Sequence, residues 1–204
     1  MQLIAEGLAS TRGERSIFAR VSFAVDAGGA LVLVGPNGSG KTTLIRIIAG
    51  LLAPSAGTLR LDGGDAERGV GEQCHYLGHL DAVKPGLTVE ENARFWSGFL
   101  GGGSGMIDAA LEAFGLERLR DMPVAYLSAG QRRRLGLARV LLAKRPVWLL
   151  DEPTVSLDAA AQAALLRIVS AHLDDGGLLV AATHVPLGLA TARELQLGPV
   201  VAAA

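Results

Sequence analysis

The stretch VGPNGSGKTTL, from Val34 to Leu44, decides the fold class of this 204-residue chain. The compact apolar run ALVLV before it is typical of a buried strand, and apolar residues recur after it at helical spacing up to Leu52. Between them, GPNGSGKT fits the phosphate-binding pattern G-x-x-x-x-G-K-[ST]. A glycine turn that only joins a strand to a helix is the alternative, which this context disfavours.

Each part of the motif suits a bound polyphosphate. Glycines let the backbone curl with its N–H groups pointing inward, and the following helix presents its positive N-terminus to an anion. Lys41 adds a positive charge for the β- and γ-phosphates, and the Thr42 hydroxyl can bind Mg²⁺. The predicted nucleotide-binding residues are Gly35, Pro36, Asn37, Gly38, Ser39, Gly40, Lys41, Thr42 and Thr43.

A second apolar run, VWLLDEP, ends in two carboxylates, Asp151 and Glu152. We expect Asp151 beside Mg²⁺ and Glu152 at the mouth of the site, where it can polarise a water molecule for attack on the γ-phosphate. The alternative is that both carboxylates cap the next helix. A phosphate site in the same chain favours the catalytic interpretation.

The rest of the chain alternates apolar strands with helices, which indicates an α/β domain around a mainly parallel sheet. Ligands of such sheets lie beyond the carboxyl ends of the strands, where Gly35, Asp151, Glu152 and His184 are all predicted. Further strands are predicted near 3–8, 22–25, 57–63, 74–79 and 178–184, and further helices at 89–100, 106–119, from 128 onward and at 158–173.

The composition narrows the class of protein. Half of the residues are apolar, so the chain can form one domain with a sizeable core, and the net charge of −1 gives no reason to expect nucleic acid as a partner. Cys74 is the single cysteine, so a reducing cytosol is the simpler location. The sequence predicts neither a membrane-spanning segment nor a secretory signal.

The segment LSAGQRRRLGLARVLLA (127–143) predicts a long helix that begins after Ser128, a good N-cap residue. Arg132, Arg133 and Arg134 then lie in its first turns, where positive charge opposes the helix dipole. We expect a nearby anion to offset them. A capped helix with a solvated basic face is the alternative.

LSAGQ resembles the LSGGQ signature of ATP-binding-cassette (ABC) ATPases, with Ala129 in place of the first glycine. The order of GPNGSGKT, LSAGQ, LLDEP, SLD (156–158) and ATH (182–184) is similar to that family across most of the chain. The resemblance implies a P-loop α/β fold with an antiparallel β portion at the N-terminus. It also implies one domain, divided into an α/β core of about 1–81 and 141–204 and a helical subdomain of about 82–140.

The same resemblance implies roles for individual residues, with ATP and Mg²⁺ as cofactors. Glu152 would be the catalytic base, His184 would contact the γ-phosphate, and Asp158 would lie in the D-loop at a dimer interface. For His184, a structural histidine at a strand end is the alternative. The signature residues that would contact ATP held by a second copy are Leu127, Ser128, Ala129, Gly130 and Gln131.

Within the family, the segments YLGHLDAVKPGLTVEEN (76–92) and THVPL (183–187) are similar to ATP-binding subunits that serve c-type cytochrome biogenesis. This resemblance implies integral membrane subunits and a second copy as partners, with haem delivery or export as the task. It also implies a peripheral location on the cytoplasmic side of the bacterial inner membrane. The sequence contains no Cys-x-x-Cys-His motif and so gives no sign that the chain itself binds haem.

Two positions depart from the family's pattern. Arg12 stands where the family stacks adenine on an aromatic ring, and its planar guanidinium is the expected substitute. The Q-loop glutamine falls at His79 or Leu80, neither of which is glutamine. We expect His79 or Asp81 to reach Mg²⁺ or a water molecule instead.

Two other functions compete with a transporter ATPase. A soluble ABC ATPase acting on nucleic acid or ribosomes is disfavoured by the net charge and by the absence of a second cassette. A small-molecule kinase would need an acceptor pocket and a lid, and would have no use for LSAGQ.

Overall fold

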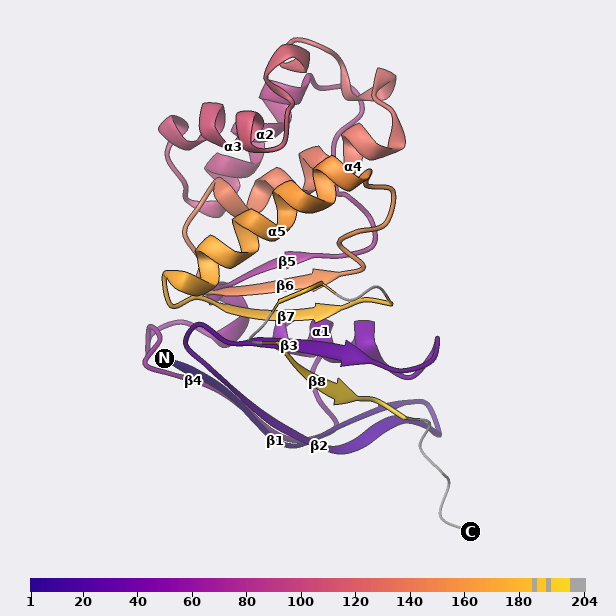
Figure 1. Ribbon diagram of the computed structural model, residues 1–204. Helices are drawn as coiled ribbons and strands as arrows, with labels where there is room; N and C mark the ends of the chain where they lie inside the picture. The colour runs from indigo at the N-terminus through magenta and orange to yellow at the C-terminus, as the bar shows by residue number, and fades with distance from the viewer. Residues whose placement is uncertain (185–186, 190–191, 199–204) are drawn as a thin grey trace. The chain divides into compact units, whose positions relative to one another are not determined.

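The computed structural model describes residues 1–184, 187–189 and 192–198 (Figure 1). The strands are β1 (Gln2–Arg12), β2 (Arg15–Asp26), β3 (Ala30–Val34), β4 (Ala56–Asp62), β5 (Cys74–Leu77), β6 (Val147–Asp151), β7 (Leu178–Ala182) and β8 (Ala192–Gln196). The helices are α1 (Lys41–Ile48), α2 (Val89–Leu100), α3 (Ile107–Ala113), α4 (Ala129–Ala138) and α5 (Ala159–Asp174).

The chain forms two compact units. Unit 1 contains Met1–Tyr76, Pro146–Glu152 and Ser170–Ala204, and unit 2 contains Leu77–Arg145 and Pro153–Val169. The P-loop and the strands that lead into it belong to unit 1. The signature helix α4 belongs to unit 2.

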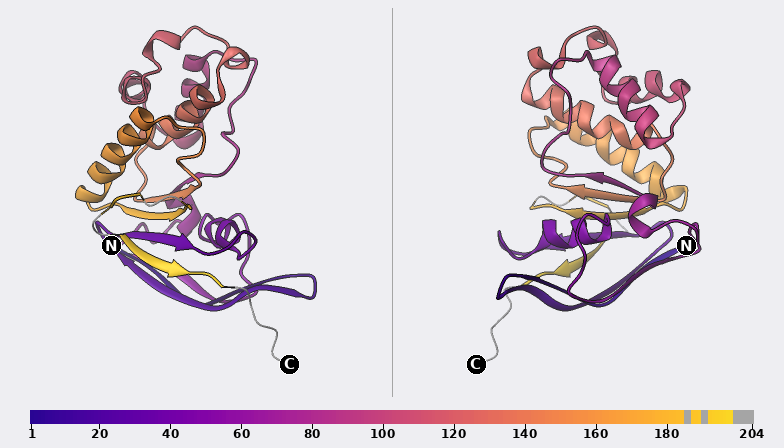
Figure 2. Two further views of the ribbon diagram at one scale, coloured as in Figure 1. Left: turned by 45° about the vertical axis from the view of Figure 1, so that its right-hand side comes forward. Right: turned by 180° about the vertical axis from the view of Figure 1, so that it is seen from behind.

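Unit 1 is built around two sheets, which Figures 1 and 2 show from three sides. One has the strand order β2-β1-β4, with antiparallel pairing of β1 to both neighbours. The other has the order β5-β6-β7-β3-β8, with parallel pairing of β3 to β7 and β8 and of β6 to β7. This arrangement confirms the predicted parallel sheet with an antiparallel portion at the N-terminus.

Strand β6 alternates its side chains between two covered faces, which explains its unbroken apolar sequence. Val147 and Leu149 join a hydrophobic cluster that also contains residues of α1 and of both sheets. Trp148 lies on the other face, where its ring stacks on His172 of α5 with centroids 3.9 Å apart. Both faces are therefore covered, and all five residues of β6 are buried.

The pairing register brings the ends of neighbouring strands together. Asp151, the last residue of β6, pairs with Ala182, the last residue of β7. Val34 ends β3, which is also parallel to β7. Because parallel strands share one carboxyl edge, the segments that follow all three strands begin at the same edge of the sheet.

Several elements differ from their predicted bounds. The helix predicted over 106–119 is present but shorter, because α3 ends at Ala113 and Gly115 adopts a left-handed φ of +61°. The signature helix is shorter than predicted, since α4 gives way to a 3₁₀ turn at Arg139–Leu141. Strand β8 was not predicted, because its sequence ARELQ is that of a polar edge strand.

Candidate ATP-binding site

The predicted phosphate loop lies between β3 and α1. Gly40, the N-cap residue of α1, adopts a left-handed φ of +100° and supplies no side-chain cap to the described helix. The first N–H groups of α1 therefore have no capping side chain, and their positive dipole end suits an anion. The Ser39 hydroxyl is buried in the same loop and has no hydrogen-bond partner among the described residues.

Two of the glycines are required by close packing. A Cβ at Gly35 would overlap the carbonyl oxygen of Leu197, whose N–H donates to Val34 O at 2.8 Å. A Cβ at Gly40 would come within 2.9 Å of Ile17 and Phe18 side chains. The contact of Leu197 with the loop could not be predicted from the sequence, because it arises from the pairing of β8 with β3.

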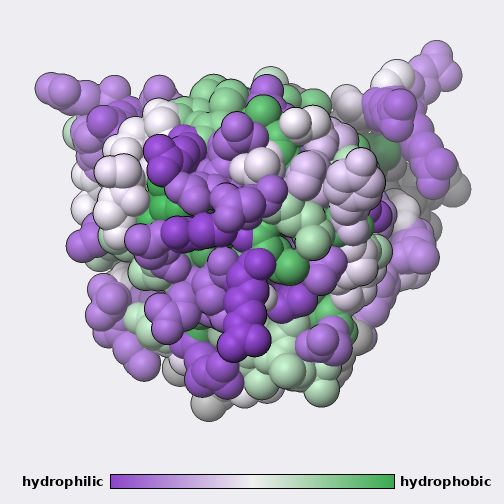
Figure 3. Space-filling model, turned by 90° about the horizontal axis from the view of Figure 1, so that it is seen from above, coloured by the Kyte–Doolittle hydropathy of each residue, from purple (hydrophilic) through white to green (hydrophobic). Residues whose placement is uncertain are grey.

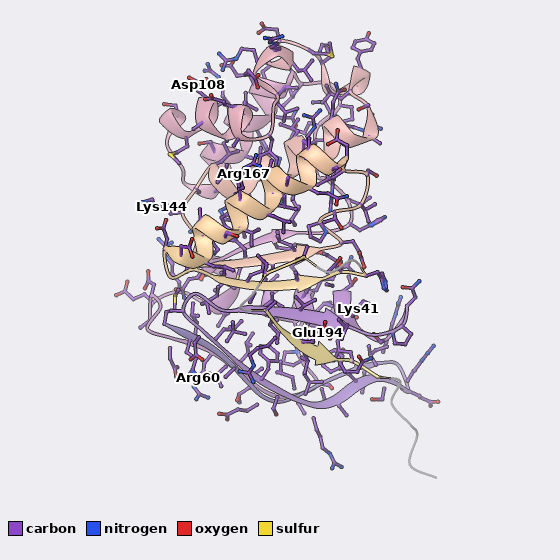
Figure 4. The ribbon with its side chains drawn as sticks, in the orientation of Figure 1. Lys41, Arg60, Asp108, Lys144, Arg167 and Glu194 are labelled. Carbon is purple, nitrogen blue, oxygen red and sulfur yellow. The ribbon has the colours of Figure 1, made fainter. Side chains whose placement is uncertain are left out.

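Lys41 lies at the start of α1 and is labelled in Figure 4. Its side chain is largely buried, and its Nζ donates to Gly35 O at 2.7 Å and Pro36 O at 3.1 Å. The ammonium group is thus held within the loop by two carbonyls. A phosphate oxygen can replace these acceptors with a stronger, charge-assisted bond. Lys41, the uncapped helix and the orphan Ser39 hydroxyl together fit a polyphosphate.

The two carboxylates follow the end of β6. Asp151 is 3% exposed, and Glu152 adopts a left-handed φ of +49° while its N–H donates to Ala182 O at 2.8 Å. Such a backbone is strained by about 1 kcal/mol or more for a residue with a Cβ, and strain of this kind concentrates at functional sites. Neither carboxylate caps α5, because Asp158 accepts a hydrogen bond from Ala161 N at 2.8 Å.

The structure brings three predicted site residues together at the carboxyl edge of the sheet. His184 Nε2 lies 3.1 Å from Asn37 Oδ1 and 3.4 Å from Glu152 Oε1. Asn37 comes from the phosphate loop, Glu152 from the end of β6 and His184 from the end of β7. Since Glu152 and His184 are both partly open to solvent, they can hold a water molecule beside a phosphate bound in the loop.

The signature segment forms a complete capping box in unit 2. Ser128 Oγ accepts from Gln131 N at 3.2 Å, and Gln131 Oε1 accepts from Ser128 N at 2.8 Å. Ala129 is exposed, whereas a Cβ at Gly130 would come within 2.9 Å of Ser156 O. Alanine therefore fits at 129, but the second glycine of the signature has no room for a side chain.

The three signature arginines, which were expected to lie near a bound anion, have acceptors within unit 2. Arg132 donates to Leu127 O at 2.6 Å, and Arg134 donates to Phe114 O at 2.9 Å. Arg133 is buried and forms an ion pair with Asp81 at 2.9 Å. All three guanidinium groups have acceptors inside unit 2, which offset the unfavourable helix dipole.

The two departures from the family's pattern have different surroundings. Arg12 is exposed at the end of β1, opposite Arg15 at the tip of the hairpin. His79 is exposed in the bend after β5, so its suggested role stays a prediction. The Asp81 carboxylate accepts a hydrogen bond from Arg133, a residue of the same unit.

No group of three or more His, Cys, Asp or Glu side chains that could hold a metal ion occurs in the described part of the chain. Mg²⁺ in nucleotide sites commonly takes one or two protein ligands together with phosphate oxygens and water. Asp151 and the half-buried Thr42 are of the required chemical type.

Comparisons with known proteins identify the family of this chain. The family described as ABC transporter matches residues 18–155. The "Cytochrome c biogenesis ATP-binding export protein CcmA" of Rhodopseudomonas palustris is 56% identical over 198 residues, covering 97% of this chain and 98% of the relative. The protein of the same name from Nitrobacter winogradskyi is 54% identical over the same shares of both chains.

Solved structures give the same result for the fold. An ATP-binding subunit of an ABC transporter superimposes with a TM-score of 0.80 at 27% identity, covering 90% of this chain and 80% of that one. A Pyrococcus furiosus protein superimposes with a TM-score of 0.83 at 24% identity, covering 97% of this chain and 98% of that one, and shows the fold alone.

Proposed function

Because this chain belongs to the ABC transporter family, and is thereby an ATP-binding ATPase, we propose that it drives an export complex in c-type cytochrome biogenesis. One observation carries the proposal. The phosphate loop, Glu152 and His184 converge in a chain that matches, nearly end to end, relatives named for cytochrome c biogenesis. Haem delivery or export is the proposed task of the complex.

The proposed reaction is hydrolysis of ATP by water. Residues 35–43 bind the phosphates, and Lys41 exchanges its two loop carbonyls for phosphate oxygens. Thr42 and Asp151 would hold Mg²⁺, which when bound neutralises charge on the phosphate oxygens. Glu152 takes the proton of the attacking water at Oε1, and His184 orients that water through Nε2. Arg12 is the proposed adenine contact and His79 the proposed substitute for the Q-loop glutamine.

We further propose that two copies of the chain share each ATP. In this proposal each copy is divided into an α/β core of about 1–81 and 141–204 and a helical subdomain of about 82–140. The exposed residues Ser128 and Ala129 mark an open helix N-terminus, which can donate hydrogen bonds to ATP held by a second copy. Asp158 is also exposed, as a residue at a dimer interface must be in the single chain.

Ser128→Arg tests the shared site. The bulky cation should leave ATP binding to the single chain intact, abolish ATP-dependent dimerisation and lower turnover by about a hundredfold or more, since loss of one charge-stabilising donor costs about that much. Nucleotide titration, gel filtration and phosphate release measure the three effects. Ser104→Arg, at an exposed position of the same unit, is the control and should behave like wild type. Normal turnover of Ser128→Arg would make a self-contained P-loop enzyme the better interpretation.

Attachment to a membrane requires a partner in this proposal. None of the helices in the described ranges is long and apolar enough to cross a bilayer. Helix α2 instead carries an aromatic patch, which we define as the exposed Phe95 and Phe99 and the half-buried Trp96, with Phe99 71% exposed. Figure 3 shows apolar side chains gathered between hydrophilic ones on the face seen from above. We propose that the aromatic patch docks on a membrane subunit at the cytoplasmic face of the inner membrane.

Sedimentation tests this docking. Wild-type protein should sediment with membranes when it is co-expressed with its membrane subunits, and should stay in the supernatant without them. Phe99→Ser should lose most of the sedimenting fraction, because it removes the most exposed ring of the patch. Met106→Ser, also exposed in unit 2, is the matched control. Sedimentation without a partner, or equal sedimentation of Phe99→Ser, would refute the docking proposal.

A further inference from the structure

The loop after β5, here called loop 78–82, is clamped by the signature helix. Arg133 Nη1 of α4 donates to Gly78 O at 3.0 Å and to Asp81 Oδ1 at 2.9 Å. Arg139, which follows α4, donates to Asp81 O at 3.2 Å. Two arginines of one helical segment thus bind both ends of the loop.

Steric contacts add to the clamp. A Cβ at Gly136 would lie 3.1 Å from both Asp81 Cβ and Asp81 O, so α4 approaches the loop as closely as a glycine allows. On the other side, Trp96 Nε1 of α2 donates to Ala82 O at 3.0 Å, and Ala82 adopts a left-handed φ of +53°. The loop is therefore held in one conformation between α4 and α2.

The Asp81 carboxylate is important because Arg133 beside it is buried and Arg139 is half-buried. Arg133 is 4% exposed and Asp81 23% exposed. Burial lowers the pKa of Arg139 to about 10, while the Asp81 carboxylate opposes this effect and the Arg133 charge adds to it. Removing the carboxylate would leave the charge of the buried Arg133 and of the half-buried Arg139 less well compensated, which is costly inside a protein. The orientation of α4 therefore depends on Asp81.

We propose that Asp81 is a positioning residue for ATP hydrolysis, which acts through Arg133 to fix α4 and hence Ser128–Gly130 at its N-terminus. It does so without binding Mg²⁺. The inference rests on the proposed function, because it assumes that the signature residues contact ATP. Trp96 belongs to the aromatic patch, so loop 78–82 also joins that patch to α4.

A double-mutant cycle in the full-length chain tests this role, using Asp81→Asn, Arg133→Met and both together. Each single variant should lower kcat by about tenfold, within the range of coupling energies for a buried pair, with KM for ATP and the Mg²⁺ dependence unchanged within about twofold. The double variant should be no slower than the slower single variant. Asp108→Asn, which removes a carboxylate from the exposed pair with Arg120 in the same unit, should match wild type.

Hydrogen exchange gives a readout that does not require turnover. The amides of Ala129–Ala138 should exchange faster in both single variants than in wild type or Asp108→Asn. Wild-type turnover by Asp81→Asn, effects that multiply in the double variant, or a raised Mg²⁺ requirement would each overturn the inference. If the wild-type chain hydrolyses no ATP, the proposed function is wrong. In that case, equal exchange of the α4 amides in wild type and in the two single variants would separately overturn the role of Asp81.

Discussion

Glu152→Gln is expected to lower kcat for ATP hydrolysis by at least about a hundredfold, in line with the loss of a general base, while ATP still binds. The amide keeps the size of the side chain and a contact to His184, but it cannot accept the proton of the attacking water. The left-handed backbone at 152 is unaffected by this change. ATP should therefore persist, and the variant should accumulate as an ATP-loaded dimer that gel filtration and phosphate release can detect.

The control for this variant lies on the same unit. Glu194→Gln makes the same chemical change at an exposed position of β8, labelled in Figure 4, and should leave turnover unchanged. Normal hydrolysis by Glu152→Gln would remove this carboxylate from the mechanism. Loss of ATP binding would show instead that the carboxylate is needed to form the nucleotide site.

Lys41→Ala is the second variant with a large expected effect. It should abolish measurable turnover and weaken ATP binding by more than about tenfold, because a charge-assisted bond to phosphate is lost in a partly desolvated loop. The two bonds from Nζ to Gly35 O and Pro36 O are lost as well, so the loop itself should become less ordered. Nucleotide titration followed by steady-state kinetics measures both effects.

Lys144→Ala is the matched change at an exposed lysine and should retain binding and turnover. Turnover by Lys41→Ala at the wild-type rate would show that the loop is not the active site. Preserved ATP binding with no turnover would give Lys41 a role in the chemical step alone.

The fold class and the centre of the site could be predicted because their signals are local. The phosphate loop is a contiguous motif, and the parallel sheet places the residues after β6 and β7 at the edge where the loop also lies. The convergence of Glu152, His184 and Asn37 follows from strand direction rather than from any long-range signal.

The errors concern contacts between residues far apart in the chain. Arg133 was expected beside a bound anion because the sequence shows only the dipole of its own helix, whereas the anion beside it in the structure is the Asp81 carboxylate, 52 positions earlier in the chain. Leu197 braces the phosphate loop through a strand whose polar sequence gave no sign of pairing. Helix α3 ends at Ala113 because Gly115 adopts a left-handed backbone that ends the helix, although apolar residues continue at helical spacing to Leu119.

The two tryptophans of the chain have distinct surroundings, and one lies in each unit. Trp148 is almost fully buried with its ring flat against the imidazole of His172, whereas Trp96 lies 4.0 Å from the guanidinium carbon of Arg139. Indole emission depends on its immediate neighbours, so the tryptophan fluorescence of the protein is the sum of two local signals. Variants that retain a single tryptophan would give each unit its own optical reporter without an added dye.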